Sequence, residues 1–144
     1  MNESEDSLME MVYEATPNIL SVRWSDDLSV ESARFLQTIV SLFATIREKQ
    51  VANLIVESGI PAGGVLTEDI INYFIQNIPG TPLKRIAILE SSDYLWDSNL
   101  YQVIKMLITS YNLPIGVELL KNKPDARKWF SSIPETEKSK PTID

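Results

Sequence analysis

The run Asn53-Leu54-Ile55-Val56-Glu57 decides the fold, because it is short, apolar at its centre and without alternation between apolar and polar residues. Such a run indicates a strand that is covered on both faces and therefore belongs to a parallel sheet. Residues 85–90 repeat the pattern, and residues 115–120 form a last apolar run. We therefore expect a sheet whose central strands run parallel.

Helical patterns separate these strands. Residues 30–49 and 97–111 carry apolar residues at helical spacing, and a helix from 67 to 78 begins with Thr-Glu-Asp and stops at Pro79-Gly80. The stripe of the first helix is wider than one core contact requires. Either another element packs against the side of this helix, or part of the stripe binds a partner.

The two ends of the expected domain complete the pattern. Residues 11–16 and 19–24 flank the turn Pro17-Asn18 and predict a β-hairpin, with Leu, Val and Trp on one side of the second strand and a wet opposite side. Residues 125–130 predict a short terminal helix. The order is ββαβαβαβα, which favours an α/β fold with a single, mainly parallel sheet and one antiparallel edge strand.

Length and composition indicate one domain. The chain has 144 residues and 44% hydrophobic residues, enough apolar side chain for an ordinary core. Residues 1–9 are acidic and residues 132–144 are polar and bracketed by prolines, so we expect both to be disordered tails. The domain is expected over residues 10–131.

Charge and missing residue types exclude several functions. The chain contains no His and no Cys, which excludes His- or Cys-dependent nucleophiles, His/Cys metal sites and disulfides, and we expect no cofactor and no metal. A net charge of −7 makes nucleic acid an unsuitable partner. No apolar run is long enough to cross a bilayer, and the acidic start does not resemble a secretory signal, so we expect a cytoplasmic protein.

A family resemblance rests on four segments: residues 19–24, 53–57, 85–89 and the terminal Ala-Arg-Lys-Trp-Phe of residues 126–130. Their order and spacing over residues 10–131 resemble the STAS-like superfamily, in particular the small SpoIIAA-like (STAS/SEC14-type) proteins. The resemblance implies a fold and a binding or signalling role more than a reaction. Classical members are phosphorylated on the Ser of an Asp-Ser-x-Gly turn, which this chain lacks, because its central strand continues as Glu57-Ser58-Gly59.

Carboxylates follow two strands in matching contexts. Glu57 precedes Ser58 and Glu90 precedes Ser91, so we expect the two carboxylates at equivalent ends of neighbouring strands, where ligands of parallel sheets gather. They would lie close enough to share a proton or a cation, with Asp93 nearby. The alternative is that these are ordinary polar residues at the rim of the sheet and in a turn.

Three loops are further candidates for a ligand or partner site. Gly63-Gly64 either lets a partner approach closely or supplies a turn before Thr67. Tyr94 and Trp96 either anchor a partner or fold back over the helix beneath them. Lys121 and Lys123 either attract an acidic partner or are solvated loop lysines.

Three functions fit these observations. The first is a non-enzymatic STAS-like domain for protein interaction or signalling, with a protein partner or self-association as a homodimer. The second is a small carrier that holds a lipid-like or other apolar ligand between the helices and the sheet. The third is an enzyme that uses Glu57 and Glu90, and it ranks last because no nucleophile or oxyanion-hole motif accompanies them.

Overall fold

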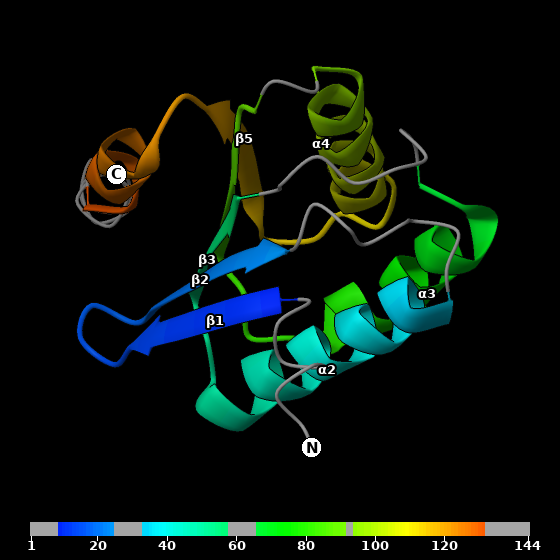
Figure 1. Ribbon diagram of the computed structural model, residues 1–144, viewed down its shortest axis with the longest axis horizontal. Coiled ribbons are helices and arrows are strands. Elements are labelled where there is room, and N and C mark those ends of the chain that lie inside the picture. The colour runs from blue at the N-terminus through cyan, green and yellow to red at the C-terminus, as the bar shows by residue number, and fades with distance from the viewer. Residues whose placement is uncertain (1–8, 25–32, 58–65, 92–93, 132–144) are drawn as a thin grey trace, which may run out of the picture.

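The structure of the protein is a computed structural model that describes residues 9–24, 33–57, 66–91 and 94–131. Its elements follow the predicted order ββαβαβαβα (Figure 1). They are β1 (Met9–Glu14), β2 (Ile19–Trp24), α2 (Ala33–Lys49), β3 (Asn53–Glu57), α3 (Glu68–Asn77) with the short 3-10 helix η1 (Ile78–Gly80), β4 (Arg85–Leu89), α4 (Tyr94–Ser110), β5 (Gly116–Leu120) and a C-terminal helix over residues 123–131.

The strands form one sheet in the order β1-β2-β3-β4-β5. β1 runs antiparallel to β2, and all other pairs are parallel, which confirms the mainly parallel sheet with an antiparallel edge strand. Because neighbours in the sheet are also neighbours in sequence, connections of one hand bring α2, α3 and α4 onto the same side. Figure 1 shows these helices on one side of the sheet and the C-terminal helix on the other.

The face toward α2, α3 and α4, here called the helical face, carries the larger core. Alternate residues of β2, β3 and β4 point into it and are buried: Leu20, Val22, Leu54, Val56, Ile86 and Ile88. They belong to one cluster with the apolar stripes of the three helices. This face therefore supplies most of the apolar burial among the described residues.

The wide apolar stripe of α2 is explained by its neighbour α3. The ring of Phe43 lies 5.5 Å from that of Tyr73 and 6.0 Å from that of Phe74, measured between centroids. Phe43 is buried, while Val40, further round the same flank, is exposed. Of the two explanations offered for the stripe, packing against another element therefore accounts for its width.

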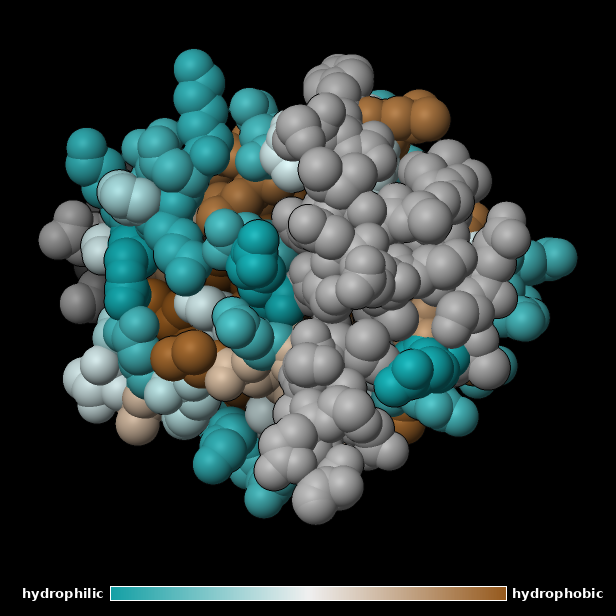
Figure 2. Space-filling view, in the orientation of Figure 1, coloured by the Kyte–Doolittle hydropathy of each residue, from teal (hydrophilic) through white to brown (hydrophobic). Residues whose placement is uncertain are grey.

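The opposite face, here called the C-terminal face, is covered in part by the C-terminal helix. Ala126 and Phe130 pack against Ile19, Ile55, Ala87 and Leu89. The wet side predicted for the hairpin is confirmed for Arg23 but wrong for Ile19, which is 2% exposed because the terminal helix covers it. On the side of the molecule that carries β1 and this helix, hydrophilic residues predominate and apolar ones show between them (Figure 2).

Two further contacts fasten the C-terminal helix to the sheet. Arg127 donates from Nη2 to both carboxylate oxygens of Glu14, at 2.7 and 2.5 Å. The Trp129 ring also packs beside Gly116 of β5, where a Cβ would lie 3.5 Å from the ring, at ordinary contact distance. The helix is thus held by a small apolar contact and an ion pair.

Polar side chains connect the hairpin turn to the start of β3. The Tyr13 hydroxyl and the Ala52 N–H both donate to Asn18 Oδ1, at 3.1 and 3.3 Å. Asn53 donates from Nδ2 to the Asn18 carbonyl at 3.1 Å and accepts at Oδ1 from Arg85 Nε at 3.0 Å. Asn53 and Arg85 are buried, so these bonds satisfy polar groups at the amino ends of the strands.

Two predicted boundaries are wrong by a few residues. β1 begins at Met9, which is buried and lies inside the tail predicted at 1–9; residues 1–8 and 132–144 are outside the described residues. α4 begins at Tyr94 rather than near 97, because Trp96 is buried in the core from the first helical turn. None of the described helices combines the length and hydropathy that a bilayer span requires.

Candidate binding groove

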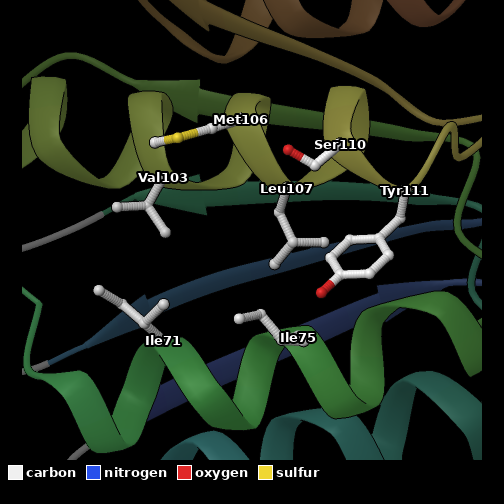
Figure 3. Close-up of a pocket in the computed structure, with 7 residues that line it drawn as sticks. All are labelled: Ile71, Ile75, Val103, Met106, Leu107, Ser110 and Tyr111. Atoms are coloured by element: carbon white, nitrogen blue, oxygen red, sulfur yellow. The ribbon is translucent and has the colours of Figure 1, made fainter.

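An apolar groove separates α3 from α4 on the outer surface of the helical layer. It has a volume of about 260 Å³ and is lined by Ile71, Ile75, Val103, Met106, Leu107, Ser110 and Tyr111. Figure 3 shows Ile71 and Ile75 pointing from α3 toward α4, Val103 and Leu107 pointing from α4 toward α3, and Tyr111, directly after α4, pointing the same way. The groove is therefore a contact between two helices that does not close at the surface.

The floor and the rim of this groove differ in exposure. Leu107 is buried at the floor, whereas Met106 is 62% exposed and Tyr111 is 54% exposed at the rim. Leu95, 63% exposed, lies on the same flank of α4 as Met106, because eleven residues correspond to about three helical turns. Two of the large exposed apolar residues in the described part of the chain, Leu95 and Met106, thus share one side of α4, and a third, Tyr111, directly follows the helix at the end of the groove.

Few charges border the groove. α3 carries Glu68 and Asp69 in its first turn, and within its bounds it contains no Lys or Arg. α4 carries Asp97, which is buried, and Lys105, whose Nζ lies 5.9 Å from the centroid of the Tyr101 ring. An exposed helical surface with so few charges is typical of an interface core rather than of a solvated face.

Local sequence sets the position of α3 beside α4. Thr67 caps α3, with its side chain accepting a hydrogen bond from the Ile70 N–H at 3.4 Å. The N–H of Leu66 donates to Asn99 Oδ1 of α4 at 2.8 Å. The start of α3 is therefore bonded to the side of α4, which defines one end of the groove.

Glu57 lies on the C-terminal face, between two cationic side chains. Its carboxylate is 4.0 Å from Arg23 Nε and 3.8 Å from Lys123 Nζ, and its side chain is partly exposed. The same three residues, with Glu10, Val12 and Ser21, line a recess of about 50 Å³. Lys123, proposed from the sequence as a solvated lysine or a partner site, is thus an ion-pair partner of Glu57.

Glu57 and Glu90 were expected at equivalent positions at the ends of neighbouring strands, and this expectation is wrong by one residue. β3 and β4 are neighbours, but their register pairs Glu57 with Leu89. Glu90 follows β4, is exposed, and donates its N–H to the Leu120 carbonyl at 2.8 Å. Because successive residues of an extended chain alternate between faces, the two carboxylates are not cross-strand neighbours.

Ser91 and Trp96 have internal partners at the start of α4. Ser91 donates from its N–H and its hydroxyl to the Asp97 carboxylate, at 2.5 and 3.0 Å. The Trp96 ring is fully buried and packs edge-to-face on Phe35, with centroids 6.1 Å apart. Of the two alternatives for these aromatics, folding back over the helix is the one that Trp96 follows.

The remaining candidates lie outside the described residues. They are Ser58, Gly63, Gly64, Asp93 and the side chain of Tyr94. Across residues 9–24, 33–57, 66–91 and 94–131, no three acidic side chains gather in an arrangement suited to a metal ion. Asp97, which the sequence analysis did not single out, is the buried carboxylate of this region.

The groove was not predicted, although two residues signalled it. Helical spacing predicts two inward stripes: Ile70, Ile71, Phe74 and Ile78 in α3, and Leu100, Val103, Ile104, Leu107, Ile108 and Tyr111 in α4. Ile75 and Met106 are apolar residues outside these stripes. Tyr111 was expected to point inward and is instead exposed at the rim. Apolar residues beyond a core stripe were the available signal, and only the packing of α3 beside α4 brings them together.

Among the described residues, the space between the helices and the sheet is small. A cavity of about 30 Å³ lies there, lined by apolar residues of α2, α3, α4, β3 and β4. This volume is on the order of one water molecule, far below the roughly 300–1,000 Å³ of ordinary ligand pockets.

No family model, curated protein or solved structure matches the chain, so the groove is interpreted from its own residues.

Proposed function

We propose that this protein is a non-enzymatic, STAS-like interaction domain that binds a protein partner through the groove between α3 and α4. The observation that carries the proposal is the gathering of exposed apolar side chains, Met106 and Tyr111, beside an open apolar hollow. Contiguous exposed apolar surface costs solubility unless something covers it. The presence of this exposed apolar surface on a chain with a net charge of −7 supports a binding role for the groove.

The residue types at the rim suit a protein partner. Met106 supplies a flexible, polarizable side chain that adapts to irregular surfaces, and Tyr111 combines a large apolar ring with a hydroxyl. Interface cores are enriched in these two residue types and depleted of charge. Both tendencies favour a protein over a charged small molecule in this groove.

The element order supports the STAS-like part of the proposal. The sheet keeps sequence order, opens with a hairpin and is followed by the terminal helix that carries Ala126, Trp129 and Phe130. The predicted likeness rested on the same segments. The absence of an Asp-Ser-x-Gly turn from the sequence separates the proposal from a phosphorylation switch of the classical kind.

A non-enzymatic role is supported by the carboxylates that an enzyme was expected to use. Glu57 lies between Arg23 and Lys123, and the register sets Leu89 rather than Glu90 beside it. Two carboxylates perform acid–base chemistry together when they flank one reacting centre. The pair is not arranged as cross-strand neighbours, so this third function has little support.

A carrier of a small apolar ligand is the second candidate, and the groove itself favours it. Its volume of about 260 Å³ approaches the lower end of ordinary ligand pockets. The ligand would lie on the outer surface between α3 and α4, rather than between the helices and the sheet as first expected. Its exposed rim makes this the weaker candidate, because ligand pockets bury most of a ligand's surface.

Site-specific photo-crosslinking tests the proposal. We would replace Met106 by p-benzoylphenylalanine in the expressing cell, irradiate, and identify adducts by mass spectrometry. Val12, 60% exposed on β1, takes the same substitution as the matched control. We expect a defined protein adduct at position 106 and none at position 12.

Two outcomes would contradict the proposal. Adducts at 106 that consist of a lipid or another small apolar molecule would replace protein binding by the carrier function. Equal labelling at positions 106 and 12, or no adduct at 106, would remove the groove as a binding site.

A further inference from the structure

We infer that the partner in the groove is a second copy of this chain, so that the α3–α4 surfaces of two subunits form a two-fold dimer. This inference rests on the proposed function and names its partner. The surface concerned comprises the groove, its rim residues Met106 and Tyr111, and Leu95 further along α4. Three properties of that surface point to self-association.

The first property is shape. A two-fold interface uses the same patch on both subunits, so the patch must offer both a hollow and something to fill it. Here the hollow lies between α3 and α4, and Met106 and Tyr111 stand exposed at its border (Figure 3). Rim side chains of one subunit can therefore occupy the groove of the other while their counterparts do the reverse.

The second property is charge. Two chains that each carry a charge of −7 repel each other, so self-association requires a patch with few unbalanced charges. No charged residue lines the groove itself. The exposed charges of the two helices are Glu68 and Asp69 at the start of α3 and Lys105 on α4, which lies beside Tyr101 rather than in the groove. Crossing α3 of one subunit over α4 of the other brings opposite charges together twice, once on each side of the axis.

The third property is extent. From Leu95 to Tyr111 the surface runs about 24 Å along α4, at 1.5 Å per residue. With the ten-residue α3, about 15 Å long, alongside at about 8–10 Å between axes, the two helices present a projected area on the order of 400 Å². Side-chain relief raises the accessible area toward the roughly 800 Å² per partner of a standard interface.

Other exposed apolar residues in the described part of the chain do not form a comparable patch. Met11 and Val12 lie on β1 between Glu10 and Glu14, and Val40 lies on α2. A second copy docked on β1 would place like carboxylates near each other. The α3–α4 surface is therefore the favoured site of self-association.

Sedimentation velocity over protein concentrations of about 1–200 μM tests the inference, because dimers of this kind respond to mass action. We expect the wild type to sediment as two chains of 16.3 kDa and Met106→Glu to raise the dissociation constant at least about tenfold. Val12→Glu is the matched control, since it adds the same charge to an exposed apolar position on β1. It should sediment as the wild type does.

A charge exchange provides a second measurement on the same surface. Lys105→Glu should weaken the dimer, and combining it with Glu68→Lys should restore part of the loss if α3 and α4 cross between subunits. Circular dichroism confirms that each variant keeps its fold, which is expected because Met106, Lys105 and Glu68 are exposed.

Each contrary outcome identifies what has failed. A wild type that stays monomeric over the whole range overturns the second copy as partner, while a photo-adduct at position 106 with a different protein leaves the proposed function standing. A dimer that Met106→Glu leaves intact and Val12→Glu dissociates overturns the groove as the interface. Failure of both the dimer and the adduct overturns the proposed function as well.

Discussion

The helical face and the C-terminal face of the sheet are covered by very different amounts of apolar surface. The helical face packs against three helices in a cluster that includes residues of all five strands. The cluster on the C-terminal face contains six buried residues, and two of them, Ala126 and Phe130, come from the C-terminal helix. The smaller contact is supplemented by ion pairs of Arg127 with Glu14 and of Lys123 with Glu57.

This comparison shows how one sheet is stabilised by two mechanisms. Apolar burial on the helical face contributes in proportion to area and is not screened by salt. Half-exposed ion pairs on the C-terminal face contribute little each and weaken as salt rises. We therefore expect substitutions on the helical face to lower global stability and those on the C-terminal face to loosen one helix.

The largest effect is expected for Trp96→Ala on the helical face. Trp96 is fully buried against Phe35, so its removal should lower the free energy of unfolding by about 3–5 kcal/mol. Urea denaturation followed by circular dichroism measures the change. Glu48→Ala, at an exposed position of α2 outside the α3–α4 surface, is the control and should stay within about 0.5 kcal/mol. Equal losses in both variants would contradict the burial of Trp96.

A smaller and more local effect is expected for Phe130→Ala on the C-terminal face. We expect a loss of about 1–3 kcal/mol, less than for a core aromatic, because the C-terminal helix can undock while the rest stays folded. Hydrogen exchange should show amides of residues 123–131 losing protection, with β3 and β4 unchanged. Loss of protection across the whole sheet would show that the two faces unfold together.

The smallest effect is expected for Arg127→Ala. Its two hydrogen bonds to Glu14 are half-exposed, so we expect a loss of about 0.5–1 kcal/mol in low salt and a smaller one in about 1 M NaCl. Lys128→Ala, an exposed position on the same helix, is the control. A loss that does not depend on salt would indicate that the Arg127 side chain acts through packing rather than charge.

Much of the fold follows from residue patterns that act over a few positions. Continuous apolar runs marked β3 and β4, Thr67 and Pro79 bracketed α3, and Pro17-Asn18 marked the hairpin turn. The errors fell where distant contacts compete with local pattern. α4 begins before its predicted start because Trp96 packs in the core. Ile19 is buried because a helix more than a hundred residues later covers it.

The candidate site was much less predictable than the fold. The sequence pointed to Glu57 and Glu90 because their local contexts match, yet the register between β3 and β4 differs from that match by one residue. Ile75 and Met106 drew no attention, because apolar residues beside a core stripe are common. They line a groove only because α3 and α4 lie side by side in the folded protein.

The amino-acid sequence by itself determined the order of strands and helices and the exclusion of His and Cys chemistry, because periodicity and composition are local properties. The tertiary structure decided which apolar residues stay exposed and which charges meet. Leu107 is buried and its neighbour Met106 is not, and Arg127 pairs with Glu14 across 113 positions. Exposure and pairing depend on how whole elements pack, and that information is spread over the chain rather than held in any one segment.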